Sequence, residues 1–375
     1  MRGTRRGIRI AASVGSIAIV LAGTTSLASA QPPFEVVASG LDNPRHVTFS
    51  ASGDLYVAEA GRGGSAPCVD HPLGEFCLGF TGAVTKVRDD GSNEQVLTDL
   101  PSIINGEGEV LGPSDIAFTG GQKFVLSIGL GGSDEFRAGF GPGGAPLGTL
   151  VSGKLKHGEW SLFADVLANE AAANPDGTDI DSNPVGLVRQ GEGYLVADAG
   201  GNAVVRASHK GTFTTIAVLP PGSALAPPFL GLPPGTEIPT DAVPTSVVQG
   251  PDGAYYISQL TGFPFEKGDA NIWRVVPGHA PTVYASRLTN LTDLAFAEDG
   301  SLYAVEIATD GLLAAPPGTP SIGSLVKVTP GASEHETVAG GLSAPYGVAL
   351  RGGAAYVTTC AVCIGDGEVI RVSLD

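Results

Sequence analysis

Acidic side chains recur at matching positions near the ends of short apolar segments of this sequence. One histidine, His46, occupies the same kind of position near the N-terminus. The carboxylates are those of Glu59, Asp115, Asp198, Asp293 and Glu306. Such oxygen ligands suit a hard divalent cation, and a histidine among carboxylates also suits acid–base chemistry. The structural alternative is that these carboxylates accept hydrogen bonds from neighbouring turns.

A second group of oxygen-bearing side chains lies within one ten-residue segment. Its carboxylates are Asp176, Asp179 and Asp181, and Asn174 and Asn183 lie at its two ends. Calcium prefers such clusters of oxygen ligands. The spacing does not match the EF-hand loop, which needs a glycine at its sixth position and a closing glutamate. Asx-turns explain these residues about as well as a metal site does.

Candidate ligand-binding side chains occupy the same two kinds of position. Arg45, His46 and Tyr346 follow a proline at the start of an apolar segment, and Gln259 ends one. In a repeated unit of antiparallel strands, the start of the first strand and the end of the second lie on one face. We therefore expect these four side chains on the face that carries the carboxylates.

An internal repeat must position all of these residues. Six segments begin with a short motif, usually containing proline, and lead through a Gly-containing turn into a second apolar strand. A third strand follows in each, and most repeats close with a fourth. Short strands between turn signals, with no long helical period, indicate an all-β fold. Six repeats of four strands predict a six-bladed β-propeller, which we favour over two separate β domains.

The predicted ring closes through the N-terminal strand. The sixth repeat stops after its third strand, and residues 34–38 have a strand pattern without a hairpin partner. We expect these residues to form the outer strand of the last blade. The propeller is expected over residues 31–375, with blades near residues 43–101, 112–169, 183–220, 243–288, 290–341, and 344–375 together with 34–38.

Residues 1–30 have the pattern of a signal peptide. Four arginines precede an apolar stretch, and Ala28 and Ala30 supply the small residues of a cleavage site. The arginine pair at residues 5 and 6 also resembles a twin-arginine signal, so either the general secretory route or the twin-arginine route is possible. The mature protein is expected to be secreted, periplasmic or on the cell surface, without a membrane span.

The expected export of the protein bears on the oxidation state of its four cysteines. Cys68 and Cys77 lie in one loop-like stretch, and Cys360 and Cys363 form a C-x-x-C. Oxidising conditions favour two disulfides, for which we predict the pairs Cys68–Cys77 and Cys360–Cys363. Pairing between the two loops, a redox motif and half of a zinc site remain alternatives.

Composition limits the partners. The 375 residues include 55 Gly and 28 Pro, and 38 acidic residues outnumber 21 basic ones, for a net charge of −17. Nucleic acid is excluded as a partner, because a phosphate backbone is bound by clustered Lys and Arg. We expect a monomer that binds an unknown small molecule, glycan or protein.

The repeat pattern resembles a known group of proteins. An Asn-Pro motif at residues 43–44 and the Gly-x-Leu-Tyr-Val-Ala-Glu pattern of residues 53–59 resemble secreted NHL and gluconolactonase-like propellers. Residues 38–45 with 53–61, and residues 173–177 leading into 181–184, are more similar to the ScyD/ScyE family. The resemblance implies an exported six-bladed propeller and does not define a reaction.

Two functions follow from these observations. The first is an exported, ScyD/ScyE-like propeller that binds a ligand through its loop-rich face. The alternative is a divalent-metal-dependent, lactonase-like hydrolase with carboxylates at the mouth of the channel. The sequence suggests only Ca²⁺ or another divalent cation as a cofactor. It contains no G-x-S-x-G nucleophile motif.

Overall fold

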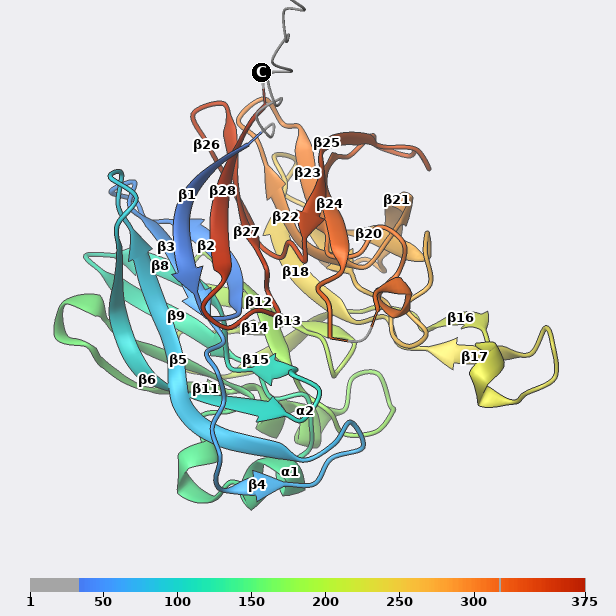
Figure 1. Ribbon diagram of the computed structural model, residues 1–375, viewed down its shortest axis with the longest axis horizontal. Helices are drawn as coiled ribbons and strands as arrows, with labels where there is room; N and C mark the ends of the chain where they lie inside the picture. The colour runs from blue at the N-terminus through green and yellow to red at the C-terminus, as the bar shows by residue number, and fades with distance from the viewer. Residues whose placement is uncertain (1–33, 317, 375) are drawn as a thin grey trace, which may run out of the picture. The chain divides into compact units, whose positions relative to one another are not determined.

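A computed structural model describes residues 34–316 and 318–374 of the chain. The signal peptide expected over residues 1–30 lies outside the described residues. Six antiparallel sheets of four to six strands are arranged around a central axis (Figure 1). The architecture is therefore the predicted all-β, six-bladed propeller.

The strand nearest the axis is the first of each sheet. These inner strands are β2 (Pro44–Phe49), β8 (Pro113–Gly120), β12 (Pro184–Gln190), β18 (Pro244–Gln249), β22 (Leu291–Phe296) and β26 (Val348–Arg351). The second strands are β3 (Leu55–Glu59), β9 (Lys123–Ile128), β13 (Gly193–Asp198), β19 (Tyr255–Gln259), β23 (Leu302–Glu306) and β27 (Ala354–Thr359). Most residues of the second strands are buried, as expected for strands covered on both faces.

The third and fourth strands complete each blade toward the outside. The third strands are β5 (Phe76–Val87), β10 (Thr149–Lys154), β14 (Ala203–Ala207), β20 (Ala270–Val275), β24 (Ile322–Lys327) and β28 (Gly367–Ser373). The outer strands are β6 (Asn93–Asn105), β11 (Glu159–Asp165), β15 (Phe213–Val218), β21 (Thr282–Leu288), β25 (Glu336–Ser343) and β1 (Phe34–Leu41).

The remaining elements lie in the connections. Strands β4 (Cys68–Val69) and β7 (Val110–Leu111) extend the first sheet, and β16 (Gly222–Leu225) pairs with β17 (Glu237–Thr240) in a hairpin that projects from the sheets (Figure 1). The helical elements are α1 (Asp134–Gly139), α2 (Val166–Ala173), η1 (Gly141–Gly144), η2 (Leu155–His157), η3 (Pro228–Leu230) and η4 (Leu312–Ala314). Among the described residues, none of the helices is long and apolar enough to cross a membrane.

The ring closes as the sequence predicts. Each inner strand contacts the inner strands of both neighbouring blades, and β26 contacts β2. Strand β1 pairs antiparallel with β28, from Phe34 opposite Val372 to Leu41 opposite Gly367, and Figure 1 shows the two strands side by side. The N-terminal strand therefore completes the last blade and covers what would be an exposed strand edge.

The apolar core is divided among the interfaces between successive blades. Between blades one and two, for example, Tyr56 and Leu97 pack with Ile116 and Leu126. The closing interface has its own cluster, in which Val57 of blade one joins buried residues of blade six. Each blade therefore covers an apolar face of the next, which is why such repeats fold only together.

Candidate functional site

A β-bulge at the start of the inner strands creates the geometry of the site. In blades one to five the pairing of the inner strand with the second strand shifts register directly after the first inner-strand residue, as between Pro113 and Asp115. A bulge re-aims side chains that would otherwise alternate between two faces. Here two successive residues of each inner segment line spaces along the axis and form two rings.

The upper ring lines a funnel on the loop-rich face. Its members, one from each blade, are Arg45, Ser114, Val185, Thr245, Thr292 and Tyr346. With the turn between β6 and β7 and residues 318–320 and 362–366, they enclose a cavity of about 750 Å³. This volume suits a small molecule, since ligand pockets in proteins span roughly 300–1,000 Å³.

Arg45 and Tyr346 form one unit in the wall of this funnel. The guanidinium carbon of Arg45 lies 4.9 Å from the centre of the Tyr346 ring, and Arg45 Nη2 donates a hydrogen bond of 2.6 Å to the Val110 carbonyl. The cation–π contact and the hydrogen bond hold the arginine in place. Arg45 is therefore a cation held in a fixed position. Gln259, the other ligand-binding candidate, has a structural hydrogen bond instead, because its Oε1 accepts from Trp273 Nε1 at 3.0 Å.

The lower ring contains four buried or half-buried polar side chains. Its members are His46, Asp115, Gly186, Ser246, Asp293 and Gly347. The four with polar side chains line a second cavity of about 300 Å³ along the axis. His46 is only 2% exposed, its Nδ1 lies 3.1 Å from the Ser114 carbonyl, and its Nε2 lies 3.7 Å from Asp293 Oδ1.

Both aspartates of the lower ring are anchored by backbone N–H groups. Asp115 accepts from Ile116 and Leu187, each at 2.7 Å. Burial raises the pKa of Asp115 to about 7, the charge of His46 lowers it, and Asp293 raises it. Burial likewise raises the pKa of Asp293, and His46 again opposes the shift. The axis thus holds two carboxyl groups of raised pKa beside one imidazole, which is a set of groups able to exchange protons.

The carboxylates at the ends of the second strands accept hydrogen bonds from nearby backbone and hydroxyl groups. Glu59 accepts from the backbone N–H of Asp42 at 2.6 Å and from Thr85 Oγ1. Glu306 accepts from the N–H of Thr289 at 2.8 Å and from Ser324 Oγ at 2.8 Å.

Asp198 follows the same pattern, with Asn183 N–H at 2.6 Å and Ser182 Oγ at 2.8 Å. Each of these carboxylates therefore braces the segment that leads into its own inner strand. The structure places them within the blades, apart from the cluster of His46, Asp115 and Asp293.

The ten-residue segment with three aspartates lies on the loop-rich face beside blade three. Asp176 accepts from Thr178 and from Asn202 Nδ2, the latter at 2.9 Å. Asp179 is exposed, whereas Asp181 is partly buried near Asp198. A buried carboxylate that sequence reasoning missed, Glu170 of α2, joins this group. Glu170 lies in a short helix between two repeats, so the repeat pattern did not point to it.

Both predicted disulfides are present. Cys68 pairs with Cys77 across β4 and β5, and Cys360 pairs with Cys363 in the loop between β27 and β28. The second pair fixes part of the funnel, because Val362 and Cys363 line it. The glycine-rich connection at residues 129–147 contains α1 and η1.

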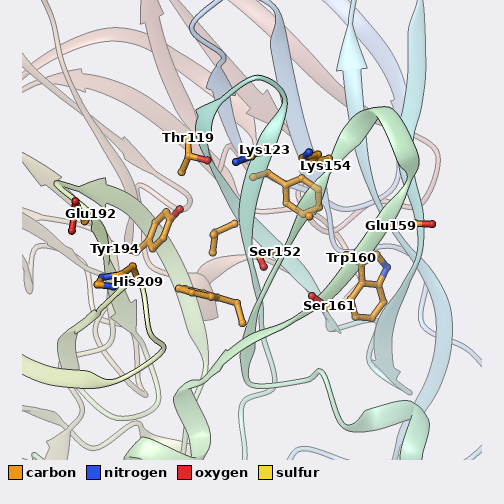
Figure 2. A pocket seen from close by; sticks show the side chains of 14 residues that line it. Thr119, Lys123, Ser152, Lys154, Glu159, Trp160, Ser161, Glu192, Tyr194 and His209 are labelled. Carbon is orange, nitrogen blue, oxygen red and sulfur yellow. The ribbon is translucent and has the colours of Figure 1, made fainter.

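Another pocket lies on the opposite face, between blades two and three. It has a volume of about 680 Å³ and includes Lys123 at the start of β9 and Lys154 at the end of β10. Figure 2 shows these two lysines at one end, with Tyr194 and His209 on one side and Trp160 on the other. Unlike the funnel, which every blade lines, this pocket is lined by residues of blades two and three.

Fold and site together define a six-bladed β-propeller with a polar axis. No protein-family model and no curated protein sequence matches the chain. Among solved structures, it is similar to a protein of unknown function from Bacteroides thetaiotaomicron, with 11% identity over 90% of this chain and 75% of that one and a TM-score of 0.52.

Two further similar structures are named after enzymes. A protein assigned as a gluconolactonase has 11% identity over 91% of this chain and 93% of that one, with a TM-score of 0.50. Virginiamycin B lyase from Staphylococcus aureus has 12% identity over 90% of this chain and 98% of that one, with a TM-score of 0.48. The neighbours are propellers. At identities this low, the similarity supports a conclusion about the fold alone.

Proposed function

We propose that this protein is an exported, monomeric β-propeller that binds a small amphipathic molecule in the funnel of its loop-rich face. The observation that supports this most is the fixed Arg45–Tyr346 pair in the wall of a cavity to which every blade contributes a residue. The resemblance of the repeats to the ScyD/ScyE family is consistent with an exported binding protein. Two disulfides also suit an oxidising compartment.

The chemistry of the ligand follows from the lining. Arg45 offers a cation to a carboxylate, sulfonate or similar acceptor, and the hydroxyl groups of Thr245 and Thr292 supply polar surface. Val362 and Ile364 are each 47% exposed at the rim and offer apolar contact. The ligand class proposed is therefore a small molecule with one anionic group and an apolar body.

The test uses anilinonaphthalene sulfonate, a fluorescent probe with this combination of groups. We expect Arg45→Met to weaken its binding roughly tenfold, since a charge-assisted contact contributes about 1.5 kcal/mol or more. The matched control is Lys123→Met, which removes a cation from the pocket on the opposite face. Equal binding by wild type and Arg45→Met, with both folded, would contradict the proposal.

The axial cluster favours a second function, a metal-dependent hydrolase. Among the described residues, His46 Nε2 is buried without a hydrogen-bond partner, and it lies near the carboxyl groups of Asp115 and Asp293. Imidazole nitrogen and carboxylate oxygen are donor types that divalent cations accept, and a bound cation would polarise a carbonyl group or activate water. His46, Asp115 and Asp293 would hold it.

Elemental analysis of protein purified without chelator, combined with a lactone-hydrolysis assay, tests the second function. We expect His46→Gln to lose both the metal and the hydrolysis. Turnover that is the same in wild type and His46→Gln would exclude the axial cluster as its source.

A further inference from the structure

Basic side chains gather at one place on the face opposite the funnel. Four of the seven lysines of the chain lie there in blades two and three, namely Lys123, Lys154, Lys156 and Lys210. All four are exposed. They come from the start of β9, the end of β10, η2, and the turn between β14 and β15. On a chain with a net charge of −17, this concentration of positive charge attracts anions that the rest of the surface repels.

The positive charge of this patch is not neutralised within the described part of the chain. Lys86 and Lys267 form ion pairs there, whereas none of the four lysines of the patch does. Lys123 and Lys154 lie directly opposite each other in the ladder between β9 and β10, where like charges repel. Glu159 is the partner of Lys154 on β11, but Figure 2 shows its carboxylate directed away from both lysines.

The two opposed lysines stand at one end of the pocket of about 680 Å³ between blades two and three (Figure 2). Hydroxyl groups line the same pocket, since Ser152 of β10 and Ser161 of β11 face each other in their ladder and Thr119 adds a third hydroxyl. A concave site with a few polar groups at defined positions is the usual form of a small-ligand site.

Aromatic rings form the other wall of the pocket. The Tyr194 ring packs edge-on against that of Phe163 with the centroids 5.7 Å apart, and His209 lies beside Tyr194 (Figure 2). The turn that carries His209 and Lys210 packs closely on blade two, because a Cβ atom on Gly211 would fall 2.8 Å from the Phe163 carbonyl oxygen. Two blades therefore bring cations, hydroxyl groups and rings to one pocket.

We propose that this pocket binds one unit of an acidic oligosaccharide. A sugar carboxylate between Lys123 and Lys154 would form charge-assisted hydrogen bonds and relieve the repulsion between the two ammonium groups. Sugar hydroxyl groups would bond to Ser152 and Ser161. The partly positive C–H groups of the sugar ring would pack against the electron-rich faces of the aromatic side chains. The site goes beyond the proposed function, because it lies on the face opposite the funnel.

The distribution of charge favours a chain of sugars over a single compact anion. Lys156 and Lys210 lie in two adjoining turns, where they would meet the acidic groups of neighbouring units. Figure 2 shows Glu159 and Glu192 at opposite ends of the pocket, so a compact ligand with many charges would meet repulsion there. Such a ligand would also leave the hydroxyl groups and the rings without contacts. An oligosaccharide with one charge per ring avoids both penalties.

The experiment is calorimetric titration of the chain from residue 31 with trigalacturonic acid. We expect one site per chain, with an affinity that falls as the salt concentration rises. The fully methyl-esterified trisaccharide keeps the rings and lacks the charges, and it should bind at least roughly tenfold more weakly. Inorganic tripolyphosphate has the charges and lacks the rings, and it should also bind at least roughly tenfold more weakly.

Lysine variants assign the binding to this pocket. Lys123→Met and Lys154→Met change exposed side chains, so the fold should persist, and each should weaken the binding of trigalacturonic acid roughly tenfold. Lys327→Met is the matched control, because Lys327 ends the third strand of blade five as Lys154 ends that of blade two. It removes the same charge outside the pocket and should bind like wild type.

Three results would overturn the proposal. The first is the absence of trigalacturonic acid binding by wild type. The second is binding of tripolyphosphate as tight as that of the trisaccharide, which would show that charge alone is recognised. The third is wild-type affinity in both Lys123→Met and Lys154→Met, which would place the saccharide elsewhere on the protein.

Discussion

Asp115 and Asp293 make the same pair of backbone hydrogen bonds from opposite sides of the ring. Each accepts from the N–H of its own following residue and from an N–H in the next blade, which is Leu187 for Asp115 and Val348 for Asp293. In both cases the next blade has glycine, Gly186 or Gly347, at the equivalent ring position.

The two glycines let the inner strand of the blade that follows each of them approach closely. A Cβ atom on Gly347 would fall 2.6 Å from the Cα of His46, and one on Gly186 would fall 2.6 Å from the Thr245 carbonyl oxygen. The lower ring therefore reads His–Asp–Gly followed by Ser–Asp–Gly, an approximate twofold repeat in a six-bladed ring. Only the His46 half brings an imidazole to the axis.

Substitution of Asp115 by Asn should change the pH dependence of stability. The unfolded chain loses the Asp115 proton near pH 4, and the folded chain loses it near pH 7, where His46 and Asp293 face the carboxyl group. The folded state thus binds more protons in between, so the stability from this group is complete below about pH 4 and is lost as the pH rises through about 7.

The measurement is urea unfolding of wild type and Asp115→Asn at pH 4 and pH 8. Between these values wild type should lose on the order of 3 kcal/mol more unfolding free energy than the variant. The variant also loses an acceptor for a backbone N–H, so its absolute stability is not the test. Parallel pH profiles would show that Asp115 ionises normally in the folded chain.

The rings were accessible from the sequence because the repeats align. Two successive residues follow the proline at the start of a repeat. They are Arg45 and His46 in blade one and Ser114 and Asp115 in blade two. The repeat also predicted the ring closure. What the alignment could not supply was the bulge in blades one to five, which lets both residues of a pair such as Ser114 and Asp115 line the axis.

Glu59 and Glu306 illustrate the limit of the pattern. A carboxylate at the end of a second strand has the same place in the repeat whether it faces a ligand or braces a turn. The N–H groups of Asp42 and Thr289, which these carboxylates bind, become partners only after the chain has folded. Glu170 could not be found from the repeat pattern, because α2 lies in the connection between β11 and β12.

Removal of the Glu59 carboxylate should destabilise the protein. Glu59→Ala leaves the buried Asp42 N–H and Thr85 Oγ1 without their acceptor, at an expected cost of about 2–4 kcal/mol in unfolding free energy. Glu59→Gln keeps one acceptor oxygen and should cost less. Glu192→Ala, at an exposed position, is the control and should be within about 0.5 kcal/mol of wild type. If Glu59→Ala is as stable as that control, the bracing role is wrong.

Deletion of the N-terminal strand should affect the last blade and the oligomeric state together. A chain that begins at residue 41 lacks most of β1, including Ala38, which is 3% exposed in the core between blades six and one. It also leaves the outer edge of β28 without its partner, and unpaired strand edges associate with one another.

Thermal melting and light scattering measure the two consequences. Relative to a chain that begins at residue 31, the shorter chain should melt at least roughly 10 °C lower and form dimers or larger species. A chain that begins at residue 34 keeps all of β1 and serves as the control, and it should match the longer one. A monomer beginning at residue 41 with an unchanged Tm would mean that β28 does not depend on β1, although the two strands are hydrogen-bonded from Phe34 to Leu41.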